Sequence, residues 1–333
     1  MRILIRPRLP VLALLLLAPS IPELLTGSTP ISNLVFDPPG FAVGFLLDVG
    51  LYGTGALLIR EYAVAYRKGW ASILLLGAAY GIAEEGFAVH TFFQTSGSPV
   101  GVLGSYGHLW GVNWLWALGL TIFHATYSIA LPILLTQLWF PESKGVRWFD
   151  RGLVGILATV YLLEVVVFAL LVGHGPSPSA LAFFLALVAL LLYLATRAPT
   201  DLLSVRTGAS RIGRTGLVLT GALGFGAWAL VLLFSGTKGV PAVGAALALV
   251  LIDIAVVGIV VRRVGTERLD RSKFYFATGM LGSLFVWDVP VEFSVPGILL
   301  VAALFAYLLF RLSRTLDRRE TATIPPGVTR TAS

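Results

Sequence analysis

Four ionisable side chains lie within three consecutive apolar stretches of this sequence. Asp48 belongs to one stretch, Glu84 and Glu85 to the next, and His124 to the third. Ionisable groups within a membrane segment cost ~2.5–3.5 kcal/mol on insertion scales and therefore mark candidate functional sites. Carboxylates beside an imidazole can activate water, hold a metal ion or relay protons. Glu84, Glu85 and His124 are therefore the candidate catalytic residues, and Asp48 joins them as a candidate metal ligand.

The spacing of small residues predicts that these groups face one another. Gly77, Gly81, Glu84 and Ala88 share one face of a helix, where a second helix can approach closely. Two further small or polar faces carry the other ionisable groups: Gly44, Asp48 and Gly55, and Asn113, Ala117, Thr121, His124 and Ser128. At ~1.5 Å per residue all four groups lie roughly 10–18 Å below one boundary of the membrane. We expect one polar site in the outer half of the bilayer; the alternative is purely structural hydrogen bonding between helices.

The elements that must position these residues are transmembrane helices. Apolar residues form 57% of the 333 and charged residues 12%, and the mean hydropathy is +0.88. Soluble domains carry about 25% charged residues, so this chain needs lipid as its solvent. Its apolar blocks approach the ~20 residues that a helix needs to cross a bilayer. We predict an all-α bundle of about ten spans: 9–25, 41–59, 71–92, 112–138, 152–172, 179–196, 216–235, 240–261, 274–290 and 295–312.

The distribution of Lys and Arg predicts that both termini are cytoplasmic. With ten spans, all but one of the 24 Lys and Arg residues fall in loops on one side, the exception being Lys238. Such loops are cytoplasmic by the positive-inside rule. This bias also explains the net charge of +7, so the expected partners are membrane lipids and not nucleic acid; the sequence says nothing of protein partners. The predicted location is the cell membrane, and no Lys or Arg is expected within a span.

The loops are short, which predicts a single transmembrane domain over residues 1–317. Its first part, 1–172, holds most of the polar residues within spans, whereas 173–317 is plainer; 318–333 is expected to be a disordered cytoplasmic tail. The basic start followed by Leu12–Ala18 also resembles a signal peptide. We favour an uncleaved first helix, because prolines crowd the possible cleavage site.

Several other polar residues are left open by the sequence. Glu164 and Asp253 are single carboxylates in apolar helices, where a structural role and a site role are both possible. His108 and His174 fall in outer loops and are expected to be solvated. Pro132 is expected to free a backbone carbonyl near Ser128 and to kink the helix. Cysteine is absent, which excludes disulfides and thiolate sites.

About a third of the chain resembles an uncharacterised family of prokaryotic polytopic membrane proteins. The matching pieces, between residues 18 and 141, are Ala18-Pro19 through Glu23-Leu24 to Gly27-Ser28-Thr29-Pro30, Tyr80-Gly81-Ile82-Ala83-Glu84-Glu85-Gly86, Leu103-Gly104-Ser105-Tyr106-Gly107, Gly111-Val112-Asn113-Trp114, and His124 through Ser128-Ile129-Ala130-Leu131-Pro132. This resemblance implies a membrane protein and no particular activity.

A fainter resemblance is to the CAAX-processing intramembrane proteases, whose sites combine a Glu-Glu pair with membrane histidines. Glu84-Glu85 matches the pair. The family's Arg, four residues after the second Glu, is Val89 here, and its Phe-x-x-x-His would need Phe where Leu120 stands. Its His-x-x-x-Asn can only be His124 to Ser128. The likeness therefore consists of the glutamate pair alone.

Three functions remain open from the sequence. An intramembrane hydrolase would use Glu84 or Glu85 as base and His124 to polarise the substrate or bind a metal ion, and this is the leading hypothesis. A proton- or cation-coupled transporter would bind its ion at the same carboxylates and relay protons through His124. A non-catalytic protein that binds lipid or a membrane partner is the third. Whether the protein is an enzyme, and whether its cofactor is a bound cation, therefore stays open.

Overall fold

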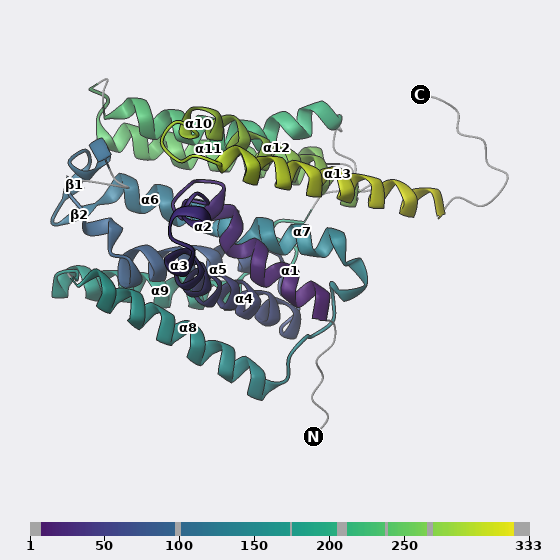
Figure 1. Ribbon diagram of the computed structural model, residues 1–333, viewed down its shortest axis with the longest axis horizontal. Coiled ribbons are helices and arrows are strands. Elements are labelled where there is room, and N and C mark those ends of the chain that lie inside the picture. Colours follow the sequence, from purple (N-terminus) through teal and green to yellow (C-terminus); the bar gives the residue numbers. More distant parts are fainter. Residues whose placement is uncertain are drawn as a thin grey trace.

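The computed structural model describes residues 8–96, 101–173, 175–204, 212–236, 239–264 and 269–322. Within them the chain is a bundle of long helices, with one short β-hairpin at one end (Figure 1). Nine helices are long and apolar enough to cross a membrane. They agree with nine of the ten predicted spans, and the predicted all-α class is confirmed.

Most spans begin and end within a few residues of the prediction. The first group comprises the continuous helices α3–η2–α4 (Pro38–Asp48, Val49–Gly53, Thr54–Ala65), α5–η3 (Trp70–Ile82, Ala83–Ala88) and α6–η6–α7 (Trp114–Phe123, His124–Ala130, Leu131–Trp139), then α8 (Arg151–Val172) and α9 (Pro178–Arg197). The second group is α10 (Arg214–Ser235), α11 (Ala242–Arg263), α12 (Leu269–Val291) and α13 (Ile298–Ala322). Short elements join them: α2 (Asn33–Phe36), η4 (Thr91–Phe93), η5 (Gly101–Gly104), β1 (His108–Leu109), β2 (Val112–Asn113) and η7 (Pro141–Ser143).

The first predicted span forms a shorter helix. α1 (Arg8–Pro19) continues into the π-helical turn η1 (Ser20–Leu24), which gives about 25 Å at ~1.5 Å per residue. Leu14, Ala18 and Ile21 are fully buried in the bundle. α1–η1 therefore contributes side chains to the core of the bundle.

Polar side chains fix where several helices begin. The side chain of Asp37 accepts a hydrogen bond from the N–H of Gly40 at 3.1 Å, and Asp150 accepts one from Leu153 at 2.9 Å. Asn113 similarly accepts from the N–H of Trp116 at 3.2 Å. Each satisfies one of the N–H groups that a helix start leaves unpaired. α3 and α8 therefore begin close to the predicted boundaries, and α6 begins directly after the hairpin.

The bundle has two ends, which we call the hairpin face and the basic face. The hairpin face carries β1 and β2, where His108 pairs with Asn113. The basic face carries the ends of α4, α7, α9, α11 and α13; here Lys68 donates to the carbonyl of Thr196 at 2.5 Å, and Arg319 donates to that of Leu138 at 2.8 Å. α1 begins and α13 ends on the side away from the hairpin (Figure 1).

The two groups of helices share one hydrophobic core. α10 to α13 lie together and pack on the α6–α7 helix (Figure 1), and one buried cluster extends from Ile21 to Leu316. α9, which the sequence placed with the plainer part, packs against α5 of the first group. α13 continues to Ala322, so the first residues of the predicted tail are helical, and the rest of that tail lies outside the described residues.

The structure corrects the expectation that no Arg or Lys lies within a span. α4 continues to Ala65, so Arg60 lies inside the helix and is only 2% exposed, instead of lying in a loop. Its guanidinium pairs with the buried carboxylate of Glu61 and stacks 3.6 Å above the ring of Trp148. These compensating contacts explain why the helix can carry a buried cation.

Candidate functional site

Four segments of π-helix in the described part of the chain supply one set of polar side chains. η1 carries Glu23, η2 carries Tyr52, η3 carries Glu84 and Glu85, and η6 carries His124. π-Helical turns are rare and occur frequently at functional sites. Their coincidence around these residues indicates a specialised site instead of ordinary helix packing.

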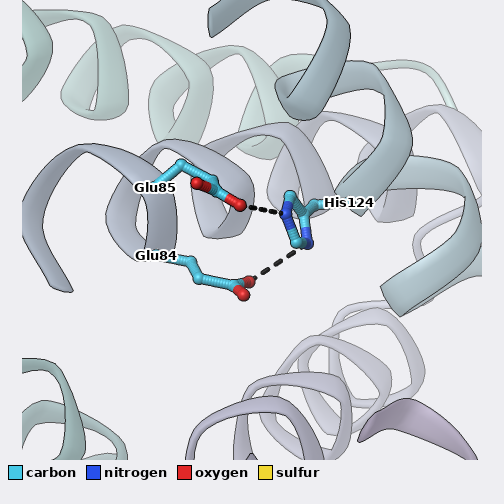
Figure 2. Close-up of side chains that lie close together, drawn as sticks. All are labelled: Glu84, Glu85 and His124. Atoms are coloured by element: carbon cyan, nitrogen blue, oxygen red, sulfur yellow. Dashed lines mark hydrogen bonds and ion pairs between the residues drawn. The ribbon is translucent and has the colours of Figure 1, made fainter. Parts of the chain in front are cut away.

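The centre of the site is His124, which lies between the two glutamates (Figure 2). Its Nε2 is 2.9 Å from Oε1 of Glu85, and its Nδ1 is 3.1 Å from Oε2 of Glu84. The three residues are 3%, 6% and 2% exposed. The structure therefore brings together the three predicted catalytic residues, although His124 lies on a different helix from the adjacent Glu84 and Glu85.

Neighbouring side chains hold the orientation of these groups. The hydroxyl of Ser128 lies 2.9 Å from Nδ1 of His124, one turn along η6. Thr91 donates to Glu85 and accepts from the indole N–H of Trp116 at 3.1 Å. The carboxylate and the imidazole are thus fixed from both sides, as a preorganised site requires.

Close helix approach brings η3 and η6 together. A Cβ atom added at Gly77 would lie 2.8 Å from Cα of Ala125, and one at Gly81 would lie 2.8 Å from Cβ of His124. The small-residue face predicted from the sequence is confirmed at these two glycines. Pro132, the second residue of α7, lacks the N–H that would bond the carbonyl of Ser128, which favours the wider turn.

The site extends beyond the three central residues to two more carboxyl groups. Tyr52 donates a hydrogen bond of 2.5 Å to Oε1 of Glu23 and also interacts with Glu84. The hydroxyl of Thr29 lies 3.0 Å from Oε2 of Glu23 and 3.0 Å from Oδ2 of Asp48. We call Glu23, Thr29, Asp48, Tyr52, Glu84, Glu85 and His124 the acidic centre.

The geometry at Thr29 constrains the protons of this centre. A hydroxyl has one hydrogen and can donate it to only one of the two carboxyl groups. A favourable second contact therefore needs a proton on Glu23 or Asp48, which that carboxyl group then donates.

Other residues singled out in the sequence occupy different positions. Glu164 approaches the acidic centre from α8: a Cβ atom at Gly50 would lie 2.3 Å from its Oε1, and it interacts with Asp48. Asp253 does not join the centre; it lines a separate cavity with Tyr127. His108 lies in β1, and His174 and Lys238 lie outside the described residues.

Sequence reasoning missed three members of the acidic centre: Glu23, Thr29 and Tyr52. Glu23 lies within the predicted first span, so the insertion cost that singled out Asp48 applies equally to it. Tyr52 and Thr29 are neutral hydroxyls, which carry no comparable signal in a sequence. Asp288 was also missed; it is fully buried in α12, and neither carboxyl oxygen has a hydrogen-bond partner among the described residues.

The central residues can hold a metal ion. Glu84, Glu85 and His124 each offer a ligand atom, and these atoms lie within 4.8 Å of one another. Two carboxylates with one imidazole form a mixed oxygen and nitrogen set, which suits Mn²⁺, Fe²⁺ or Zn²⁺ better than Ca²⁺. Three protein ligands leave coordination positions for water, as in catalytic sites.

Two cavities lie nearer the basic face, and neither is lined by Glu84, Glu85 or His124. The apolar cavity, of about 360 Å³, is enclosed by α5, the α6–η6–α7 helix, α10, α11 and α12. The basic cavity, of about 330 Å³, is lined by side chains of α4, α5, α7 and the turn after η7.

The comparisons with known proteins identify a family without an assigned activity. No curated protein and no solved structure matches the sequence. The match to the family covers residues 12–324, which include the acidic centre and every helix from α1 to α13 in whole or in part. The chain belongs to this uncharacterized membrane protein family.

Proposed function

We propose that the acidic centre binds a cation, either protons or a divalent metal ion, and that the protein is a proton- or cation-coupled transporter. The proposal rests on the balance of charge among the carboxyl groups of the acidic centre. Four carboxyl groups and one imidazole are connected side chain to side chain, and within the described residues none of them forms an ion pair with Lys or Arg. Burying that much negative charge uncompensated costs several kcal/mol per ion. Bound protons or a bound cation remove this cost.

Transport is favoured over hydrolysis by the packing of the centre. The connected carboxyl groups continue from His124 through Glu23 to Asp48, with Glu164 beside them. A series of carboxyl groups and hydroxyls is typical of proton and ion pathways in membranes. Neither described cavity reaches Glu84 or Glu85, so the centre suits a small ion better than a large substrate.

Purified protein in liposomes tests this proposal. We would measure Mn²⁺ and Zn²⁺ binding calorimetrically, then follow uptake of the ion, or of protons, under an imposed inside-negative potential. Glu84→Gln and His124→Ala should abolish binding and uptake, whereas Glu142→Gln, an exposed carboxylate in η7, should behave as wild type. Wild-type binding and flux in the first two variants would exclude the centre as the ion site.

An intramembrane metal-dependent hydrolase is the second candidate. It is favoured by the three-ligand set Glu84, Glu85 and His124, which leaves room for a metal-bound water. In that case Tyr52 would donate to the developing oxyanion. Mass spectrometry of lipids and peptides incubated with the metal-loaded protein decides between the transporter and the hydrolase. Product that forms with wild type and not with Glu85→Gln, in the absence of ion flux, would favour the hydrolase.

The topology that accompanies the proposal is ten spans with both termini in the cytoplasm and the acidic centre in the outer half of a cell membrane. It is supported by the cations at the ends of α4, α9 and α11, which are Arg67, Lys68, Arg197, Arg262 and Arg263. Since the chain has no cysteine, single cysteines can be introduced at Gly145 and Leu109. An impermeant maleimide added to intact cells should label Leu109→Cys and not Gly145→Cys.

A further inference from the structure

The basic cavity is lined by four cationic side chains and by no carboxylate. Arg60, Arg67, Lys68 and Lys144 surround it, with Gln137 as a further polar group. Among the described residues Arg67, Lys68 and Lys144 form no ion pair. Arg60 is 2% exposed, and its Nε has no hydrogen-bond partner. Cations gathered around a cavity that no carboxylate lines favour an anionic occupant.

Hydrogen bonds hold Arg60 in the wall of this cavity. Nη2 of Arg60 donates to the carbonyl of Ser143 at 2.6 Å. Its partner Glu61 accepts from the backbone N–H of Trp148 at 3.0 Å. One cation of the cavity, Arg60, is therefore buried and held in place by the fold, whereas Arg67 and Lys144 are exposed at its rim.

The basic cavity adjoins the apolar cavity at Trp70, which lines both. Lys273 lines the apolar side, with Nζ 5.9 Å from the centre of the Trp70 ring. The ammonium group of Lys273 lies near that of Lys144, which repels it, and near the carboxylate of Asp270, which attracts it. Beyond this junction the lining is mostly Val, Leu, Phe and Met from α7, α10, α11 and α12, with Asp253 and Tyr127 as polar members. One end of the combined space is cationic and the other is hydrocarbon-like.

We propose that these two cavities together bind one anionic phospholipid. Its phosphate would lie among Arg67, Lys144 and Lys273, and an acyl chain would enter the apolar cavity past Trp70. Basic pockets between transmembrane helices on the cytoplasmic side are suited to anionic head groups. The site is separate from the acidic centre, and the inference does not depend on the proposed transport activity. The lipid would join the α4–α7 region to α10–α12.

Charge complementarity favours a phospholipid over a protein segment as the occupant. The oxygens of a lipid phosphate can accept hydrogen bonds from several cationic side chains at once. The ammonium groups of Lys144 and Lys273 repel each other, and a phosphate between them would offset this repulsion. An acyl chain needs no hydrogen-bond partners, which matches a lining that is almost entirely apolar. A peptide would bring backbone N–H and C=O groups that this lining cannot satisfy.

The test uses full-length protein in detergent, titrated with dioleoylphosphatidylglycerol or dioleoylphosphatidylcholine and followed by native mass spectrometry. Wild type should prefer the anionic lipid. The triple variant Arg67→Gln/Lys144→Gln/Lys273→Gln should bind it at least about tenfold more weakly, given the contribution of each cation near an anionic lipid. The matched control, Arg197→Gln/Arg262→Gln/Arg263→Gln, removes the same charge from the same face outside the cavities and should keep the preference.

Two further experiments test whether the phosphate belongs to a lipid and whether the acyl chain lies in the apolar cavity. Glycerol 3-phosphate carries the head group without chains and should not displace the lipid. Gly224→Leu places bulk in the apolar cavity, where a Cβ atom makes only an ordinary 3.5 Å contact with Val256; it should lower lipid affinity about tenfold without unfolding the protein. Equal loss in both triple variants, displacement by glycerol 3-phosphate, or wild-type affinity in Gly224→Leu would each overturn the proposal.

Discussion

Tyr52 connects the first helix to the acidic centre, because its hydroxyl donates a 2.5 Å hydrogen bond to Oε1 of Glu23. Both groups lie in π-helical turns, η2 and η1. The bond joins two helices whose pairing was not predicted from the sequence. It also makes α1 part of the site, although α1 is the shortest of the helices that cross the bundle.

Tyr52→Phe should therefore destabilise the protein without changing the shape of the core. The substitution leaves the partly buried carboxyl group of Glu23 short of a donor, which costs about 1–3 kcal/mol. Thermal unfolding in detergent measures the effect. Tyr193→Phe removes a hydroxyl from a tyrosine that is 54% exposed and should leave the melting temperature unchanged. Equal melting temperatures for wild type and Tyr52→Phe would mean that this bond contributes nothing.

Gly81→Ala should disturb the approach of η3 to η6. The new Cβ atom would lie 2.8 Å from Cβ of His124 and 3.4 Å from Cα of Thr121, so the helices must separate at a cost of about 1–3 kcal/mol. Cation binding should weaken together with stability. Gly44→Ala, with no atom within 4 Å of the added Cβ, is the control. A stable Gly81→Ala with unaltered ion affinity would contradict this account of the packing.

Arg60→Met should be among the most destabilising single changes. It leaves Glu61, which is 2% exposed, as a buried charge whose cation is gone, at a cost of about 3–5 kcal/mol. The backbone N–H groups of Trp148 and Phe149 still donate to Glu61 but carry no full charge. Chemical denaturation of the variant, compared with Arg197→Met at an exposed position, measures the difference. A loss no larger than that of the exposed control would refute the prediction.

Glu292, in the turn between α12 and α13, should make stability depend on pH in the acidic range. Backbone N–H groups of Gly297 and Leu299 donate to its carboxylate at 2.8 and 2.9 Å, and these bonds lower the pKa of Glu292 below its ordinary value. Because the folded-state pKa is the lower one, the stabilisation is complete above the unfolded pKa and disappears as pH falls through the folded pKa.

The difference in melting temperature between wild type and Glu292→Gln should accordingly be constant near neutral pH and shrink below about pH 4, near the ordinary carboxyl pKa. Glu142→Gln serves as the comparison, because Glu142 is exposed in a turn. A difference that stays constant down to pH 3 would show that the carboxylate does not hold the turn.

The sequence predicted the spans and the centre of the site because both depend on strong, local signals. Hydropathy located nine of the long helices, and the insertion cost of Glu84, Glu85 and His124 identified them in advance. The close approach at Gly77 and Gly81 was also foreseen, since small residues repeat along a helix face. The pairing of these faces across the bundle followed from the same small residues, because they allow two helices to approach closely.

The remaining features depend on contacts between distant residues. Arg60 was assigned to a loop because an isolated cation ends a span; its compensation by Glu61 and Trp148, which lie one and 88 positions away, becomes visible only in the fold. The π-helical turns were equally hidden, because a single wide turn changes the 3.6-residue period too little to appear in a pattern of apolar residues.

Those π-helical turns have a consequence for how sequences of this family can vary. A π turn bonds residue i to i+5 instead of i+4, so it accommodates one residue more than an α-helix of the same rise. Deleting one residue within His124–Ala130 would restore a regular α-helix and leave Trp114–Phe123 and Leu131–Trp139 nearly in place, because the π turn already absorbs the extra residue. The side chains of the turn itself, His124 and Ser128 among them, would then point in other directions and the contacts of His124 with the glutamates would be lost. Gaps and insertions should therefore be tolerated in the loops and absent from these four turns.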